Sequence, residues 1–546
     1  MSEPLHVALI WHMHQPLYRD PLTRRYSAPW VRLHAARDYL RMAEILSRYP
    51  DVHATFNFVP VLIEQLAEYV TNQAVDRHLA LSRLESWDAE QKKQALASFF
   101  DVDPEHVLAR DAHYMQLARL RDDVRGEATL LSNAYYRDLV ASFNLAWLSS
   151  RSAEQSPRVR ELRERSGCYS PDEIQTVLDV QSEAVRRVMP AYVQMRQAGQ
   201  IEITTSPYYH PVLPLLYDIE TAREVRPELV LPECMIAYPE DARAQMELAV
   251  EFHRGWTGSA PAGLWPPEGG VCAAMLPDVA HCGFSWLATD ENVLVRSLGV
   301  DVLRDDAGHV TNPDLLHRPY RLDAGGRSLA VVFRDRYLSD QIGFAYGHWQ
   351  AEDAVADLIG RLHVIRDRLA GSGDGHLVAI ALDGENCWDA YEENGNAFLE
   401  RLYRALSEDP ALRAVTVEEH LRHSPAATPL HHLASGSWVP SGFETWVGEP
   451  AQNEAWDLLA RTRAHALGWL EQAESSVAAE LAERIWRHVY AAEGSDWFWW
   501  CFLPNRVCGR NPYHDLFLRH IEAVYRITGQ TEYHEIVART ACGSPG

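Results

Sequence analysis

The sequence predicts an α/β fold: an incomplete (β/α)7 barrel with a helical insertion and a C-terminal α-helical domain. Seven short apolar runs, rich in Val, Ile, Leu and aromatic residues, have the signature of buried strands. Each run is followed by helical or loop sequence, which favours parallel strands. The runs begin at Leu5, Val52, Ile201, Gly263, Phe284, Leu329 and His376. In a barrel of parallel strands the carboxyl ends meet at one mouth, where active sites lie.

Helical periodicity fills the gaps between these runs. We expect a helix over Val31–Arg48, after the first run. A long amphipathic insertion occupies about residues 60–200, and such insertions commonly form a lid or a wall of a cleft. After the last run, the stretches Asn453–Leu470, Ser476–Tyr490 and Tyr513–Ile527 also look helical.

A Pro-, Ser- and Ala-rich stretch from Ser424 reads as a boundary loop. We therefore expect a barrel domain over residues 1–425 and a C-terminal helical domain over residues 426–546. The helical domain is expected to complete the substrate cleft.

Composition limits the classes of partner. The formal net charge of −25 argues against nucleic acid and against anionic membrane surfaces, because both need a basic footprint. The eight cysteines show no CxxC pair, and the amino-terminal MSEPLHVALIW enters the first run without a basic leader. No apolar run reaches the ~18 residues of a membrane span. These features predict a cytoplasmic protein, and they do not predict its oligomeric state.

Two strand ends carry acidic side chains suited to catalysis. Glu268 lies in GLWPPEGG, where proline fixes the approach and glycine allows a ligand to come close, and Trp265 beside it offers a face for a sugar ring. Asp383 ends the apolar strand of VAIALDGENCW, where burying acids costs desolvation energy. The structural alternatives are a surface-loop acid and a helix N-cap. Two convergent carboxylates are the minimum for breaking a glycosidic bond.

The first run ends in WHMHQP. Its His12 and His14 share one face of an extended segment, and Gln15 follows them. Three interpretations remain open: two histidines bonded within the core, a metal-ligand pair, or hydrogen bonding to sugar hydroxyls. The metal ranks below the sugar because the following Gln-Pro provides no acidic third ligand.

Further candidate binding residues follow other runs. Arg334, Asp335 and Asp340 come after the sixth run as groups that could bind hydroxyls directly or support the residues that do. In the helical part, Asp496 and Trp497 of AAEGSDWFWWC form an Asp-Trp pair of the kind that clamps sugars. The aromatic-rich segment GSWVPSGFETWVG, residues 436–448, has a similar composition, although core packing is the ordinary role for most of these rings.

These residues together resemble glycoside hydrolase family 57, which has five short motifs, all present here in order. They are His14–Pro16, the segment GQIEITTSPYYHP at Gly199–Pro211, GLWPPEGG at 263–270, ALDGEN at 381–386, and AEGSDWFWW at 492–500. The resemblance implies an incomplete (β/α)7 barrel followed by helices, with Glu268 as nucleophile and Asp383 as general acid/base. It places Asp496 and Trp497 at the substrate cleft. The second proline of WPPEGG departs from the small residue expected there.

The resemblance is strongest to the amylopullulanase and α-amylase-like branch, which implies a retaining hydrolase acting on α-glucans or maltooligosaccharides. It implies α-1,4 bonds, with α-1,6 bonds as a further candidate, and no cofactor or metal. A 4-α-glucanotransferase or branching enzyme with the same carboxylates is the alternative. Two other classes stay open: a metal-dependent hydrolase using His12 and His14, and a non-catalytic glucan-binding regulator.

Overall fold

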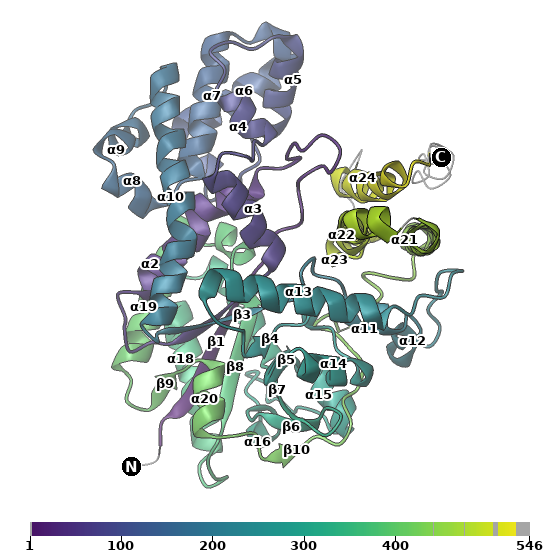
Figure 1. The fold of residues 1–546 in the computed structure, drawn as a ribbon. Helices are drawn as coiled ribbons and strands as arrows, with labels where there is room; N and C mark the ends of the chain where they lie inside the picture. The colour runs from purple at the N-terminus through teal and green to yellow at the C-terminus, as the bar shows by residue number, and fades with distance from the viewer. Residues whose placement is uncertain (1–2, 441, 474, 506–510, 531–546) are drawn as a thin grey trace.

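Seven parallel strands form a barrel in the computed structural model, which describes residues 3–440, 442–473, 475–505 and 511–530 (Figure 1). The strands are β1 (Leu5–Met13), β2 (Ala54–Phe58), β3 (Ile201–Thr205), β4 (Gly263–Leu264), β5 (Trp286–Asp290), β7 (Ser328–Arg334) and β8 (Leu377–Asp383). Their order across the sheet is β7-β5-β4-β3-β2-β1-β8. Each corresponds to one predicted run, so the predicted barrel is confirmed.

The barrel closes unevenly. β1 and β8 pair continuously from His6 with Leu377 to His12 with Asp383. β7 and β8, by contrast, join through the single register pair Arg334–Ala379. The backbone N–H of Asp335 adds a hydrogen bond to the Ala379 carbonyl, at 2.8 Å. This short seam closes the seven-stranded barrel.

Three very short strands were not predicted. β6 (Tyr320–Asp323) runs antiparallel to β7, β9 (Leu412–Ala414) pairs with β1, and β10 (Thr428–Pro429) pairs with β6. Runs of two to four residues are too short to show an alternation pattern. Because β10 belongs to the sheet, the barrel layer extends a few residues beyond position 425.

The insertion consists of helices from α3 (Pro60–Val70) to α10 (Pro171–Gln197), and its outer helices form the upper part of the molecule in Figure 1. Those outer helices are α4 (Arg77–Ser82), α5 (Ala89–Ser98), α6 (Ala112–Asp123), α7 (Asn133–Ala146), α8 (Ser150–Gln155) and α9 (Pro157–Glu164). Local sequence sets their starts, since α5 begins with a reciprocal Asp88–Gln91 capping box and α10 with the pair Ser170–Glu173.

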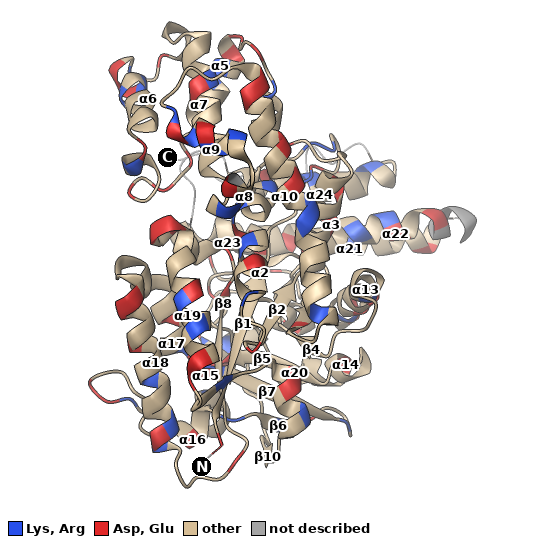
Figure 2. Cartoon of the chain, turned by 90° about the vertical axis from the view of Figure 1, so that its left-hand side faces the viewer, with Lys and Arg blue, Asp and Glu red and all other residues tan. Residues whose placement is uncertain are grey.

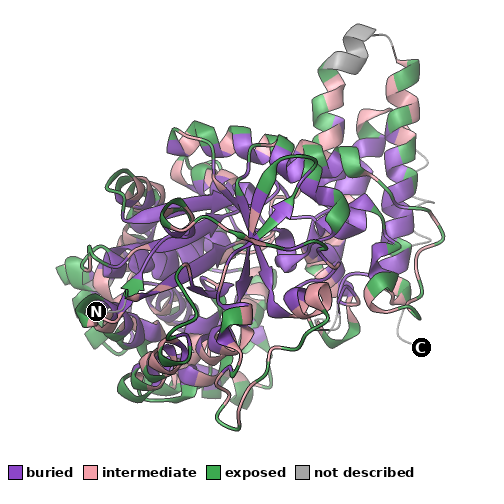
Figure 3. Ribbon diagram, turned by 90° about the horizontal axis from the view of Figure 1, so that it is seen from below, coloured by how far each residue is buried: buried purple, intermediate pink, exposed green. Residues whose placement is uncertain are grey.

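Helices cover the outside of the barrel. The predicted helix after β1 is present as α1 (Trp30–His34) and α2 (Leu40–Leu46), joined by a π-helical stretch at Ala35–Tyr39. The other long covering helices are α13 (Pro239–Thr257), α18 (Ala351–Arg368) and α19 (Asn396–Glu408). Figure 3 shows the strands buried at the centre and the exposed residues on the outward faces of the helices. In Figure 2 the charged residues lie mainly on these helices and loops.

The carboxyl-terminal helices are α21 (Pro450–Gln472), α22 (Ser475–Ala492), α23 (Ser495–Cys501) and α24 (Pro512–Ile527), at the right of Figure 1. They share one apolar core with β4, β5, β7 and the helices around them. In that core Trp456 stacks on Phe498 at 4.1 Å between ring centroids. Arg463 of α21 forms an ion pair with Asp241 of α13, which joins the helices to the barrel.

The cysteines and the apolar helices bear on two further expectations. The six cysteines among them are free thiols; Cys508 and Cys542 lie outside the described residues. In the part of the chain that the structure describes, no helix is long and apolar enough to cross a bilayer.

Candidate active site

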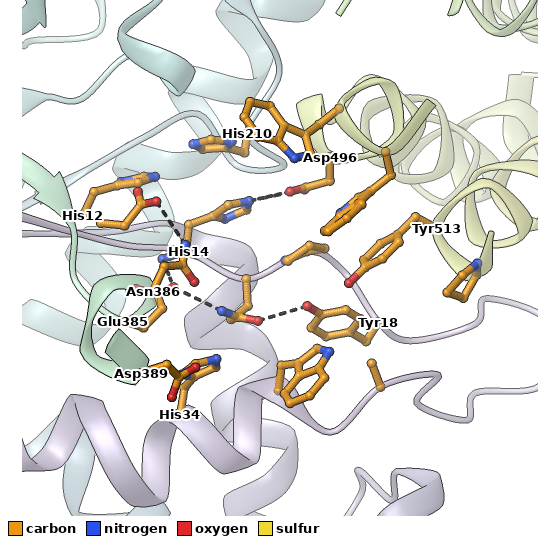
Figure 4. Close-up of a pocket in the computed structure, with 18 of the residues that line it drawn as sticks. His12, His14, Tyr18, His34, His210, Glu385, Asn386, Asp389, Asp496 and Tyr513 are labelled. Carbon is orange, nitrogen blue, oxygen red and sulfur yellow. Dashed lines mark hydrogen bonds and ion pairs between the residues drawn. The ribbon is translucent and has the colours of Figure 1, made fainter. Parts of the chain in front are cut away.

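A cleft of about 710 Å³ lies at the carboxyl ends of the barrel strands (Figure 4). The barrel forms its floor, the insertion and α1 form one wall, and the C-terminal helices form the other. The barrel strands and their loops contribute His12, His14, Gln15, Pro16, Tyr18, Ser27, Ala28, His210, Glu268, Asp383, Glu385, Asn386 and Asp389. The walls contribute Trp30, His34, Asp101, Val102, Asp103, Trp147, Asp496, Trp499, Trp500, Pro512 and Tyr513, and the segment before α21 contributes Trp438.

Glu268 lies on a tight turn after β4. Its φ is +61°, a left-handed conformation that costs energy for a residue with a Cβ, and Gly269 is also left-handed at +62°. Two contacts hold the turn: the Trp438 N–H donates to the Glu268 carbonyl at 2.9 Å, and the Thr289 hydroxyl donates to the Gly269 carbonyl at 2.6 Å. Pro267 starts the turn, and its carbonyl accepts the N–H of Gly270 at 2.9 Å. The second proline of WPPEGG therefore fits this geometry.

Both oxygens of the Glu268 carboxyl have hydrogen-bond donors. The Ser495 hydroxyl donates to Oε1 at 2.9 Å, and the Trp438 indole N–H donates to Oε2 at 3.1 Å. Burial raises the pKa of Glu268 to about 7; the Ser495 hydrogen bond opposes the shift, while Asp496 and Asp383 add to it. The carboxyl is thus buried, oriented and poised to change its charge near neutrality.

Asp383 ends β8 on the same side of the barrel. The Asn386 amide donates to its Oδ2 at 3.0 Å. Burial raises the pKa of Asp383, and the hydrogen bond with Asn386 and the charges of His14 and Arg334 only partly oppose that effect. The two predicted catalytic carboxyls therefore line one cleft, and both hold protons more tightly than ordinary acids.

Three histidines stack beside these carboxyls. The rings of His14 and His210 lie 3.9 Å apart between centroids, and His12 lies 5.1 Å from His210. His14 Nε2 lies 3.0 Å from Asp496 Oδ1, and the Asn57 amide reaches His12 Nδ1 at 2.8 Å. Burial and the neighbouring histidines keep the pKa of His12 and of His210 well below the ordinary value.

His14 differs from its neighbours in charge. Burial opposes its protonation, but the carboxylates of Asp496, Glu268 and Asp383 outweigh burial and raise the pKa of His14. Of the three stacked rings, it is the one best able to carry a positive charge. Within the described residues, no group of three or more His, Cys, Asp or Glu side chains is arranged to hold a metal ion.

Gln15 and a third carboxyl, Glu385, extend the polar floor. The Gln15 amide donates to Glu385 Oε1 at 3.1 Å, and the hydroxyl of Tyr39 donates to the same oxygen at 3.0 Å. The Gln15 carbonyl accepts the Tyr18 hydroxyl at 3.0 Å (Figure 4). Burial and the charge of Asp383 raise the pKa of Glu385 well above the ordinary value. Glu385 belongs to the ALDGEN motif, and it is a cleft residue that the sequence analysis does not predict.

Helix α23 faces the cleft with Asp496, Trp499 and Trp500. Residues separated by three and four positions share a helix face, whereas the next residue along the chain turns about 100° away. Trp497 is accordingly buried, and its indole N–H donates to the Ala491 carbonyl at 2.6 Å. The predicted cleft position of Trp497 is therefore wrong, and Trp499 and Trp500 occupy the cleft instead.

Four other predicted binding residues lie outside the cleft wall. Trp265 is buried inside the barrel, against His12 and Trp438. Arg334 lies behind Trp438, with its guanidinium 5.5 Å from the indole centroid, and forms ion pairs with Asp290 and Asp340. Asp335 turns away to His317 and Arg304 and caps a short helix, α17 (Arg336–Asp340). None of the four side chains lines the cleft, so they are not placed to bind sugar hydroxyls directly. Trp265 and Arg334 instead contact Trp438, which agrees with the supporting role that was the other expectation for Arg334.

Several cleft residues were missed for identifiable reasons. His210 is the penultimate residue of the second motif, and Trp438 lies in the aromatic-rich segment at 436–448, so a local sequence pattern includes both. Trp30, Trp147 and the acids at 101 and 103 come from helices and loops without any motif. Only the packing of the insertion against the barrel brings them to the cleft.

Comparison with known proteins identifies the family. A model of glycosyl hydrolase family 57 matches residues 8–430. The chain belongs to this family. It is therefore a member of a glycoside hydrolase family. The first four motifs lie within the matched residues. The fifth motif, at 492–500, lies beyond them, and the structure brings it to the same cleft.

Solved structures share the fold at low sequence identity. A family 57 branching enzyme from Thermococcus kodakaraensis aligns with a TM-score of 0.60 and 14% identity, over 99% of this chain and 92% of that chain. The α-amylase AmyC from Thermotoga maritima aligns at 0.59 and 13%, over 98% and 94%. A 4-α-glucanotransferase from Thermococcus litoralis aligns at 0.52 and 14%, over 96% and 60%. The family 57 architecture therefore spans nearly the whole chain.

Proposed function

We propose that this family 57 chain is a retaining glycosidase that acts on α-glucans, with Glu268 as nucleophile and Asp383 as general acid/base. The observation that supports it most directly is that two buried carboxyls, from the ends of β4 and β8, line one cleft and interact electrostatically. The compared structures, an α-amylase, a branching enzyme and a glucanotransferase, support α-glucan as the substrate class.

The proposed reaction has two steps. Glu268 attacks the anomeric carbon, the bond to the leaving glucan breaks, and Asp383 gives its proton to the leaving oxygen. Asp383 then takes a proton from water or from an acceptor hydroxyl, whose oxygen attacks the same carbon and releases Glu268. Two inversions restore the α configuration. For this mechanism we expect the carboxyls to lie about 5–5.5 Å apart when substrate is bound.

The surroundings of each acid suit its proposed role. Glu268 must be ionised to attack, and the donors Ser495 and Trp438 stabilise its anion. Asp383 must keep a proton for the leaving group, and burial favours its neutral form. His14, His12 and Asp496 would bind hydroxyls of the sugar at the cleavage site, and Trp438, Trp499 and Trp500 would stack on sugar rings.

Transfer to a second glucan is the other candidate activity. Its support is the cleft itself, which has aromatic residues on both walls: Trp30 and Trp147 on the insertion side, and Trp499, Trp500 and Tyr513 on the other. Such walls could hold an acceptor sugar while excluding water. We also propose that the chain divides into a barrel domain up to residue 425 and a helical domain from residue 426. Within the family, we propose that it is most similar to the amylopullulanase and α-amylase-like branch.

A product profile on maltoheptaose tests both candidates. Hydrolysis yields only shorter sugars, disproportionation also yields longer ones, and branching yields products resistant to an α-1,4-specific exo-enzyme. Proton NMR during the first turnovers should show α-anomeric products. First-formed β-anomers would contradict retention, and no reaction on maltoheptaose or amylopectin would contradict the substrate class.

A further inference from the structure

Ser495 lies between the proposed nucleophile and a buried histidine. Its hydroxyl oxygen is 2.9 Å from Glu268 Oε1 and 2.9 Å from His210 Nδ1, and the residue is fully buried. The backbone strengthens the link, because the Ser495 N–H donates to the His210 carbonyl at 2.9 Å and Gly494 bridges to Pro211. The turn leaves no room for a side chain at 494, where a Cβ would meet the Tyr209 carbonyl at 2.8 Å.

The direction of the two hydrogen bonds follows from proton counting. An ionised carboxylate can only accept, so the single proton of the Ser495 hydroxyl goes to Glu268. The Ser495 oxygen must then accept from His210, which requires a proton on Nδ1. Burial beside His14 and His12 keeps the pKa of His210 low, so the ring is neutral and Nε2 carries a lone pair.

That lone pair has no hydrogen-bond partner in the part of the chain that the structure describes. His210 lines the cleft, and its buried Nε2 atom makes no hydrogen bond among the described residues. A neutral Nε2 accepts a hydrogen bond, and sugar hydroxyls are donors. The tautomer that Ser495 selects is therefore the one that accepts a hydroxyl of the substrate.

We propose that Ser495 is a positioning residue, which orients Glu268 through Oε1 and selects the His210 tautomer that receives a sugar hydroxyl. Together with Trp438, which holds Oε2, it sets the plane of the carboxyl and stabilises its anion. The inference rests on the proposed role of Glu268 as nucleophile. Ser495 acts only through Glu268 and His210.

The test follows the Glu268 carboxyl directly and needs no substrate. The protein is labelled with [δ-13C]glutamate, and the carboxyl signal of Glu268 is assigned as the one that is absent from the spectrum of Glu268→Gln. The chemical shift of that signal against pH then gives the titration midpoint of Glu268. Removing a donor to a carboxylate raises its pKa, so Ser495→Ala should move the midpoint upward by about one pH unit. Ser495→Thr, which keeps the hydroxyl, should titrate like the wild type. Ser339→Ala is the matched control, since it removes an equally buried hydroxyl. That hydroxyl donates to the Asp335 carbonyl and accepts the Ala381 N–H of β8, and these contacts do not involve Glu268.

A kinetic measurement accompanies the titration. The acidic limb of kcat/KM should shift upward with the midpoint in Ser495→Ala and stay in place in Ser339→Ala. An unmoved midpoint in Ser495→Ala would overturn the proposal. If Ser495→Ala does not fold, Ser495→Cys replaces it, because a thiol is a weaker donor and should shift the midpoint in the same direction; an unmoved midpoint there overturns the proposal equally.

The two proposals can fail separately. A folded wild type that shows the expected titration but forms no glycosyl-enzyme with an activated α-glucosyl fluoride contradicts the proposed function and leaves the positioning intact. A wild type that forms the intermediate, with a Ser495→Ala midpoint equal to its own, contradicts the positioning alone.

Discussion

The His14 imidazole and the Asp496 carboxylate lie 3.0 Å apart, between Nε2 and Oδ1, although 482 positions separate them in the chain. His14 follows the first barrel strand, and Asp496 is the second residue of helix α23. This pair therefore joins the barrel to the C-terminal helices inside the cleft, next to Glu268. It makes the helices part of the site as well as part of the core.

Replacing Asp496 should weaken catalysis without unfolding the protein. In Asp496→Asn the carboxylate that raises the pKa of His14 most is lost, so the pKa of His14 should fall and its charged form should be less favoured. A hydrogen bond to a charged group contributes roughly 1.5–3 kcal/mol, so kcat/KM on maltoheptaose should fall about 10- to 100-fold.

The control for this change is Asp457→Asn. The Asp457 carboxylate of α21 also links the C-terminal helices to another part of the chain, because it accepts hydrogen bonds from the backbone N–H groups of Glu233 and Cys234. Asp457 does not line the cleft. Its kcat/KM should stay close to that of the wild type. Equal losses in the two variants would indicate a general effect of loosening the helices.

Chemical rescue should separate the roles of the two acids. Glu268→Ala lacks the proposed nucleophile, so azide should attack an activated α-glucoside from the vacated face and give a β-glycosyl azide. Asp383→Ala keeps the nucleophile and should accumulate a glycosyl-enzyme with activated substrates, which need little protonation of the leaving group. Intact-protein mass spectrometry and NMR of the azide product measure these outcomes. A β-azide from Asp383→Ala would mean that the two roles are exchanged.

The buried Glu268 should lower stability at alkaline pH. Its pKa is raised from 4.5 to about 7, so the folded state holds this proton more tightly than the unfolded state. The resulting stabilisation is fully present below pH 4.5 and is lost as pH rises through 7. Its size is at most about 3 kcal/mol, from the shift of the pKa.

Glu268→Gln tests this linkage because it cannot ionise. Its Tm should exceed that of the wild type at pH 8 and match it more closely at pH 5. The matched control is Glu90→Gln, an exposed glutamate in the first turn of α5. A wild type and Glu268→Gln with parallel Tm curves from pH 5 to 8 would show that Glu268 titrates as it does in the unfolded chain.

Trp500 should contribute to binding of longer glucans. It lines the cleft and stacks on Tyr513, with 4.7 Å between centroids and 9° between planes. Trp500→Ala removes a face on which a sugar ring would stack, so KM should rise about tenfold for maltoheptaose. The rise should be smaller for maltotriose. Trp349→Ala, which removes a half-exposed ring outside the cleft wall, should leave KM unchanged for both sugars.

The barrel and the two acids proposed to be catalytic could be predicted because the relevant signals are local. A continuous apolar run in a chain of this length indicates a buried strand, and parallel strands bring their ends to one mouth. Glu268 and Asp383 each follow such a run, so their shared cleft follows from strand order. Trp497 shows the limit of this reasoning: the motif identified the helix, and only its packing decided which face enters the cleft.

The sequence by itself determined the strand runs, the chemical types at their ends and the family motifs, because each depends on neighbouring residues. Tertiary structure alone decided that Ser495 and Trp438 hold Glu268, that His14 meets Asp496, and that Trp147 reaches the cleft. Those contacts join segments 100 or more residues apart, and they exist only because helices of the insertion and of the carboxyl-terminal region bury their apolar faces against the barrel.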